Sequence, residues 1–147
     1  MFKHVLLPTD GSPVARKAIK AGIRLAKELG AKVTAYYALD NLGSYVYSDG
    51  YAFSPVTMND LDLRTREQGA KYLAEAEKAA KAAGVVYQSL MSRPETAHQG
   101  IVAAAKKQKC DVILMASHGR GELATLLLGS VTQKVLAHSK IPVLVYR

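Results

Sequence analysis

The residues best suited to chemistry lie just after a strongly apolar stretch, residues 111–115. Ala116-Ser117-His118-Gly119-Arg120-Gly121 follow it directly, and Gly129-Ser130 come a short distance later. The apolar stretch predicts a buried strand, and Gly129-Ser130 predict the start of a helix. Backbone N–H groups between a strand and a helix bind anions well, because the helix N-terminus carries partial positive charge. The sequence therefore predicts a phosphate-binding loop.

Two side chains of this loop could add chemistry of their own. A catalytic His118 would need a nucleophile or carboxylate within reach, and none is established, so we interpret it as a hydrogen-bonded turn histidine. Arg120 fits a bidentate phosphate contact and equally well an exposed loop position. His4, His98 and His138 are scattered along the sequence without metal-ligand spacing. We therefore assign neither a catalytic residue nor a metal ligand.

The predicted helix start has two compatible interpretations. Ser130 and Gln133 are spaced as a capping box, in which the serine caps the helix and the glutamine reaches back to the N–H of the cap. The same end of the helix presents N–H groups to an anion. We expect a phosphate contact from Gly129, Ser130 or the amide of Val131.

A second motif overlaps the loop. Residues 119–124 read G-x-G-x-x-A, which is the form of a dinucleotide fingerprint. That motif belongs in the first strand-helix unit and needs an acidic residue about 20 positions later, and neither condition holds here. The context argues against NAD or FAD.

The hydrophobic pattern predicts the elements that position the loop. Strands are expected over residues 3–9, 32–39, 85–91, 111–116 and 141–146, with helices starting at Ser12-Pro13, near Asn59 or Asp60, at Thr96 and at Val131. This alternation indicates an α/β fold with a doubly wound five-stranded parallel sheet, order 3-2-1-4-5, and helices on both faces. The Asp10 loop, which follows the first strand, then faces residues 116–119 where the chain reverses direction.

Length, composition and charge limit the number of domains, the compartment and the class of partner. The 147 residues fit a single domain, 1–147, and the single cysteine, Cys110, points to a reducing compartment. No signal peptide or membrane span is evident, so we expect a cytoplasmic protein without a membrane partner. The net charge of +8 permits nucleic acid, acidic surfaces or a polyphosphate ligand, but most of the basic residues read as ordinary solvated helix faces. We do not expect nucleic acid as a partner.

Four segments together resemble the universal stress protein family over the whole chain. They are residues 5–12, 115–119, 126–131 and 141–145. The ATP-binding subgroup of that family carries the motif G-x-x-G followed, after nine further residues, by G-[ST]. The spacing matches in this sequence, where nine residues, 120–128, separate Gly119 from Gly129-Ser130. The first glycine is replaced by Ala116. Alanine is tolerated there if φ is negative and its methyl group points away from the phosphates.

The resemblance implies an ATP-binding regulatory protein of the stress response and a homodimer through strand residues 142–146. Magnesium would arrive with ATP, held largely by phosphates and water. In the family the counterpart of Asp10 lies beside the base and ribose of the nucleotide. From the sequence alone, Asp10 could equally cap the first helix or shape the turn before it. The expected nucleotide-binding residues are Pro8, Thr9, Asp10, Ala38, Leu39, Met115, Ala116, Ser117, His118, Gly119, Arg120, Gly129, Ser130 and Val131.

Two other function classes stay open. A slow ATPase would use the same phosphate-binding loop, although no base is evident. A nucleotide-free interaction protein would use the basic surface for an acidic partner. Residues 41–58 form a long tyrosine-containing connection that suits a lid, a partner surface or a mobile excursion.

Overall fold

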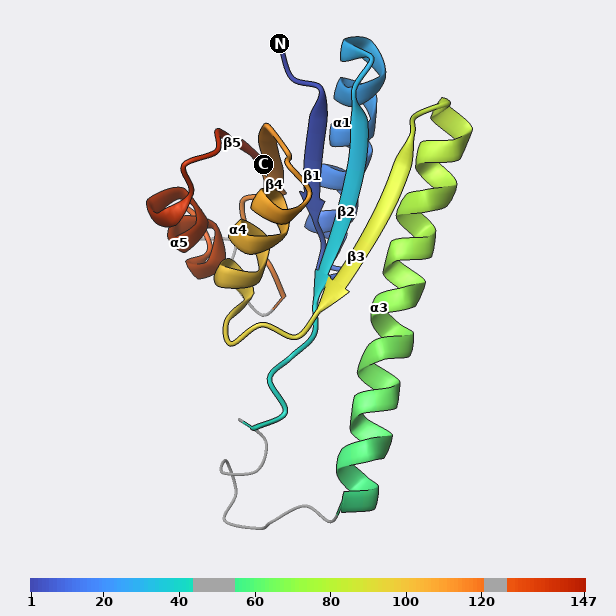
Figure 1. Ribbon diagram of the computed structural model, residues 1–147, viewed down its shortest axis with the longest axis vertical. Helices are drawn as coiled ribbons and strands as arrows, with labels where there is room; N and C mark the ends of the chain where they lie inside the picture. Colours follow the sequence, from blue (N-terminus) through green and yellow to red (C-terminus); the bar gives the residue numbers. More distant parts are fainter. Residues whose placement is uncertain (44–54, 121–126) are drawn as a thin grey trace.

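The computed structural model describes residues 1–43, 55–120 and 127–147. In chain order the elements are β1 (His4–Pro8), α1 (Pro13–Leu29), β2 (Lys32–Ala38), α3 (Pro55–Ala83), β3 (Tyr87–Ser92), α4 (Ala97–Lys107), β4 (Val112–Ala116), α5 (Ser130–His138) and β5 (Val143–Tyr146). All neighbouring strands pair in parallel, in the order β3-β2-β1-β4-β5 (Figure 1). The predicted doubly wound sheet is confirmed.

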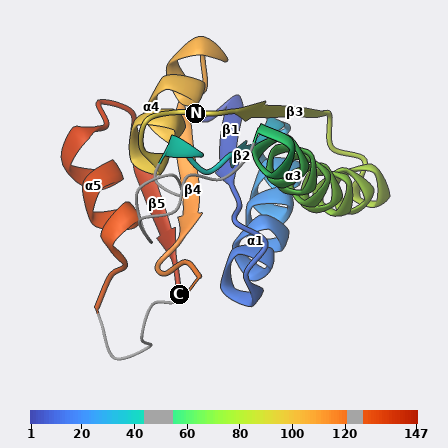
Figure 2. The same ribbon diagram turned by 90° about the horizontal axis from the view of Figure 1, so that it is seen from below.

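Helices cover both faces of the sheet. Helices α1 and α3 lie on one face, and α4 and α5 lie on the other (Figure 2). Side chains of the central strands alternate between two cores, since Val5 and Leu7 pack with the α1 and α3 side whereas Leu6 packs with the α4 side. The lone thiol, Cys110, is buried in the second core. The first strand is therefore fully enclosed, as a central parallel strand should be.

Local signals at the first helix hold in the structure. Ser12 is the N-cap of α1 and its hydroxyl accepts the N–H of Ala15 at 3.2 Å. Pro13 is the first helical residue, and Gly30 ends the helix at φ 61°. Glycine suits this left-handed position because it has no Cβ. This helix fixes where the preceding Asp10 loop must lie.

Several predicted boundaries are wrong, including those of α3, β3 and α5. Helix α3 begins at Pro55 rather than near Asn59, because proline is pre-set for a first helical position and the asparagine is not the cap. Strand β3 begins at Tyr87 rather than at residue 85, since Val85 still donates its N–H to Ala80 and so completes the end of α3. Helix α5 begins at Ser130 rather than at Val131.

The capping box expected at α5 does not form. Gly129 is the N-cap and has no side chain to offer, so Ser130 is already inside the helix. The side chain of Gln133 donates instead to the carbonyl of Leu128 at 2.9 Å. The helix start is consequently held by backbone geometry rather than by a serine cap.

No helix among the described residues is long and apolar enough to cross a membrane.

Candidate functional site

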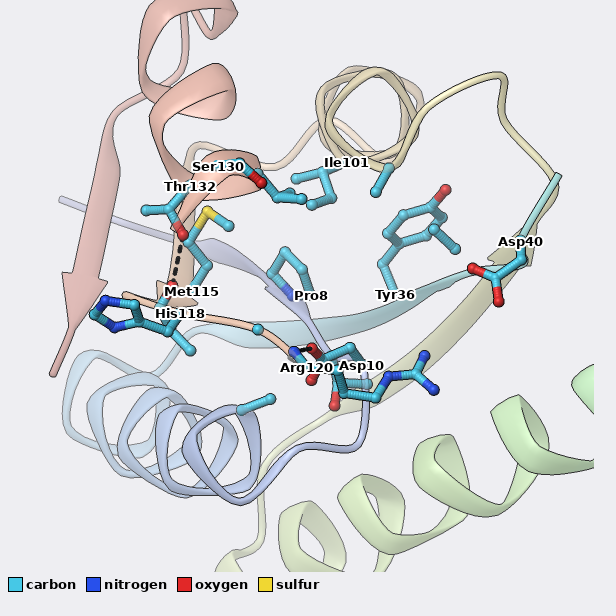
Figure 3. A pocket seen from close by; sticks show the side chains of 17 residues that line it. Pro8, Asp10, Tyr36, Asp40, Ile101, Met115, His118, Arg120, Ser130 and Thr132 are labelled. Carbon is cyan, nitrogen blue, oxygen red and sulfur yellow. Dashed lines mark hydrogen bonds between the residues drawn. The ribbon is translucent and has the colours of Figure 1, made fainter. Parts of the chain in front are cut away.

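A pocket of about 290 Å³ opens where the carboxyl ends of β1, β2 and β4 meet α4 and α5 (Figure 3). Its lining residues come from both halves of the sheet and from three helices: Pro8, Thr9, Asp10, Ala15, Tyr36, Ala38, Asp40, Ala97, Ile101, Met115, Ala116, His118, Gly119, Arg120, Ser130, Val131 and Thr132. Strands β1 and β4 are neighbours from which the chain departs in opposite directions. This is the place where sheets of this type bind ligands.

The Asp10 loop is held in shape by its own side chains. The hydroxyl of Thr9 accepts the N–H of Gly11 at 3.1 Å, and Asp10 Oδ1 accepts the N–H of Ser12 at 2.9 Å. Gly11 has φ +77°, and an added Cβ would lie 2.1 Å from the Tyr72 ring. Only glycine fits this turn. The loop therefore presents Asp10 to the pocket in one defined position.

Asp10 also ties its loop to the one after β4. Asp10 Oδ2 accepts the backbone N–H of Arg120 at 2.8 Å. A Cβ on Gly119 would lie 2.9 Å from the same oxygen, so glycine lets the two loops approach. The turn-shaping interpretation of Asp10 is thus confirmed, and the predicted meeting of the two loops is confirmed with it.

The N-terminus of α5 is fastened to the end of β4. Thr132 donates its hydroxyl hydrogen to the carbonyl of Ala116 at 2.9 Å, and Gly129 donates its N–H to the carbonyl of Ser117 at 2.7 Å. Ser130, Val131 and Thr132 all line the pocket. Amides in the first turn of a helix lack acceptors within the helix and carry partial positive charge. This wall of the pocket suits an anion.

The opposite side of the pocket carries carboxylates. Asp10 and Asp40 line it, and the guanidinium of Arg120 turns toward them, with Nη2 3.4 Å from the hydroxyl of Tyr37 (Figure 3). Burial alone would lower the pKa of Arg120, but the Tyr37 contact and the two carboxylates hold that pKa above its ordinary value. The guanidinium thus faces Tyr37 and the two carboxylates, and the phosphate contact of Arg120 stays a prediction.

His118 is the hydrogen-bonded turn histidine that the sequence predicted. Its Nδ1 lies 2.9 Å from the hydroxyl of Ser117, its neighbour in the chain. The ring also lines the pocket.

Ala116 occupies a position that glycine fills in the family motif. It is the last residue of β4, and it is not among the described residues with positive φ. Its side chain packs with the core under α1 and α3, whereas neighbouring Met115 packs under α4 and α5. The backbone conformation thus does not require glycine at this position.

Three expected residues do not line the pocket. Leu39 is 3% exposed and donates its N–H to Ser92, Ser117 is also buried, and Gly129 is the N-cap of α5, next to the lining residue Ser130. The lining residues that sequence reasoning missed are Ala15, Tyr36, Asp40, Ala97, Ile101 and Thr132. The helical spacing of Ala97 and Ile101, four residues apart, would have placed them on one face of α4, but not against the pocket.

Comparison with known proteins identifies the family. A family sequence model described as "Universal stress protein family" matches residues 1–147. The chain belongs to the universal stress protein family. Among its relatives, Universal stress protein MJ0531 of Methanocaldococcus jannaschii is 33% identical over 147 residues, which cover all of this chain and 83% of the relative. Universal stress protein YxiE of Bacillus subtilis is 30% identical over 154 residues, covering both chains completely.

A solved structure agrees with this universal stress protein over nearly its whole length. The structure of MJ0577 superposes with a TM-score of 0.82 at 28% identity, covering 99% of this chain and 95% of that one. MJ0577 comes from the same organism as MJ0531. The five-stranded architecture is therefore that of the family.

Proposed function

We propose that this universal stress protein binds an adenine nucleotide, with ATP as the leading ligand, and regulates a stress response through that binding. The observation that carries the proposal is the opening of the α5 N-terminus into a pocket of about 290 Å³ at the reversal point of the sheet. Ligand pockets typically measure roughly 300–1,000 Å³, so this one suits a mononucleotide better than a dinucleotide.

The charges of the pocket support one orientation of the ligand. Phosphates bind at Ser130 and the amide of Val131, directly after the N-cap Gly129, where the helix end is positive. They avoid Asp10 and Asp40, because carboxylates repel phosphate. The base and ribose then lie toward β2, against an apolar wall of Tyr36, Ala38, Ile101 and Met115.

Two relatives support this ligand class. A universal stress protein has been solved in complex with cAMP, and it superposes with a TM-score of 0.68 at 24% identity. The universal stress protein from Archaeoglobus fulgidus has been solved in complex with dAMP, at a TM-score of 0.65 and 15% identity. At these identities the likeness is one of fold, and an adenosine phosphate is the first ligand class to test here.

Magnesium accompanies ATP in this proposal, held by phosphate oxygens and water. Within the described ranges, no three His, Cys, Asp or Glu side chains gather as a metal site. The donor set therefore suits an ion that the nucleotide carries with it rather than one that the protein holds beforehand.

The working form in this proposal is a cytoplasmic homodimer that pairs through residues 142–146 and presents its nucleotide state to a protein partner. Strand β5 is an edge strand of the sheet, and the side chain of Leu144 in it is 40% exposed. An open apolar edge invites pairing with another chain. Sedimentation at micromolar concentration checks this, since a strict monomer would overturn it.

The ligand is tested by denaturing freshly purified protein, identifying the small molecules released, and measuring the ATP-dependent shift in melting temperature. Gly129→Val should remove the shift by crowding the phosphate path, while Ala137→Val, on the exposed end of the same helix, should keep it.

Other outcomes decide between the function classes. Absence of nucleotide together with no ATP-dependent shift in the wild type would favour a nucleotide-free interaction protein. Rapid, saturable ADP production that is lost in Gly129→Val would favour an ATPase. An unchanged ATP affinity in Gly129→Val would place the site elsewhere.

A further inference from the structure

Two histidines far apart in the sequence lie side by side in the fold. His98 is in the first turn of α4, and His138 is the last residue of α5. Their ring centroids are 5.2 Å apart and their planes are tilted by 41°. The two helices pack next to each other on one face of the sheet (Figures 1 and 2). The spacing along the sequence did not indicate this pair, because the sequence could not show which helices would pack.

A hydrogen bond of His138 shows which ring nitrogen carries the hydrogen. Its Nδ1 lies 2.7 Å from the backbone carbonyl of Lys134. A carbonyl oxygen only accepts, so Nδ1 carries the hydrogen and donates it. The neutral ring then has its lone pair on Nε2, which is the state a metal ligand needs.

His98 has the same tautomer for a related reason. Its Nδ1 lies 3.0 Å from the hydroxyl of Thr96. Thr96 donates its single hydroxyl hydrogen to Gln99 Oε1 at 2.9 Å. The threonine oxygen can therefore only accept from the histidine, and Nδ1 carries the hydrogen. In metal sites a ligating histidine commonly donates its other ring N–H in this way, which fixes the orientation of the ring.

The spacing of the rings fits a shared ion. Two imidazoles that bind one tetrahedral ion with metal–nitrogen distances of about 2.0–2.1 Å have ring centroids roughly 5 Å apart. We propose that His98 and His138 bind one divalent transition-metal ion of the zinc and copper class through Nε2 of each ring. Imidazole nitrogen suits these ions, whereas magnesium and calcium prefer oxygen ligands.

The remaining coordination positions are open to water or to a ligand from solution. No third His, Cys, Asp or Glu joins the pair among the described residues, and the nearby charge is that of Lys134. An ion held by two protein ligands exchanges readily, unlike a closed four-ligand structural site. It would link the beginning of α4 to the end of α5, the two helices that form one wall of the candidate pocket.

The test is a calorimetric titration of untagged full-length protein with Zn²⁺ alone, without nucleotide. His98→Asn and His138→Asn should each weaken binding by at least about tenfold, since loss of an outer partner alone typically costs 10–100-fold. His118→Asn is the matched control: it removes another partly exposed histidine, and it should leave the affinity unchanged. Equal affinity in all three variants, or no binding by the wild type, would overturn the proposal.

A second measurement uses only the wild-type protein, so it does not depend on the folding of variants. Histidine ¹⁵N spectra should show the hydrogen of both rings on Nδ1 before metal is added. Pulsed electron paramagnetic resonance of the Cu²⁺-loaded protein should then show two imidazole nitrogens on one ion. A single coordinated imidazole, or an Nε2–H tautomer in either ring, would contradict the site.

Discussion

Asp10 and Arg120, which are 110 positions apart in the chain, are joined by a hydrogen bond of 2.8 Å from the backbone N–H of Arg120 to the aspartate carboxylate. The other carboxylate oxygen accepts the N–H of Ser12. One side chain thus holds the loops after β1 and β4 together at the mouth of the pocket. The shape of the candidate site therefore depends on this carboxylate and on the close approach that Gly119 allows.

Replacing the carboxylate by an amide tests that dependence. Asp10→Asn loses a charge-assisted acceptor, and at this partly exposed position we expect a loss of about 1 kcal/mol in unfolding free energy together with weaker ATP binding. Asp111→Asn is the matched control, because Asp111 also accepts two backbone N–H groups, from Lys3 and His4, but lies away from the pocket. Urea unfolding and ATP titration of both variants give the comparison; equal losses of ATP affinity would refute a local role.

Gly11 and Gly30 offer a pair of glycines at positive φ with different surroundings. At Gly30 an added Cβ meets nothing within 4 Å, so Gly30→Ala should cost about 1–2 kcal/mol for the left-handed backbone alone. At Gly11 the Cβ would also lie 2.1 Å from the Tyr72 ring. Gly11→Ala should therefore destabilise the protein by about 1–3 kcal/mol more, from overpacking. Chemical denaturation measures both, and similar losses would mean that the Tyr72 ring moves aside freely.

His4 should make stability depend on pH. Burial, reinforced by Lys32, lowers the pKa of this histidine in the folded protein below the ordinary 6.5, and the opposing effect of Asp111 is smaller. The unfolded chain then binds the proton more readily, so stability is complete above the ordinary pKa and decreases as the pH falls below it. Unfolding free energies at about pH 7.5 and about pH 5.5 should differ less in His4→Gln than in the wild type. An identical difference in both proteins would show that other groups cause it.

Ala116→Gly restores the glycine of the family motif and tests whether that glycine affects ATP affinity. The backbone at Ala116 does not need positive φ, and its side chain packs with the α1 side of the core. We expect ATP affinity to stay within about twofold and stability to fall by about 0.5–1 kcal/mol, because glycine loses more conformational freedom than alanine when the chain folds. A large gain in affinity would show that the alanine methyl obstructs the phosphates. Thermal melting with and without ATP gives both quantities.

Local sequence signals predicted the first helix because its ends depend on near neighbours, whereas the sheet was predicted from the alternation of strands and helices along the whole chain. The alternation of apolar strands with helices leaves few topologies, and Ser12, Pro13 and Gly30 mark a helix by its own end groups. The boundary at Pro55 was missed because Asn59 offers an equally good local cap signal. Two local signals therefore compete at this helix start, and the sequence analysis chose the wrong one.

The candidate site was predictable only where it follows the ends of strands. The residues after β1 and β4 are placed by topology, and these supplied Asp10, His118 and Gly119. Tyr36 and Ile101 reach the pocket through packing between β2 and α4, which no local spacing encodes. The pairing of His98 with His138 was hidden for the same reason.

Cys110 has a consequence for how this universal stress protein can sense its surroundings. Burial, with a smaller contribution from Asp111, raises the pKa of its thiol to about 11. At neutral pH about one thiol in ten thousand is then ionised, and the thiolate is the form that oxidants attack. The only thiol of the chain, that of Cys110, is therefore poorly reactive toward oxidants. We therefore do not expect oxidation of Cys110 to regulate this protein.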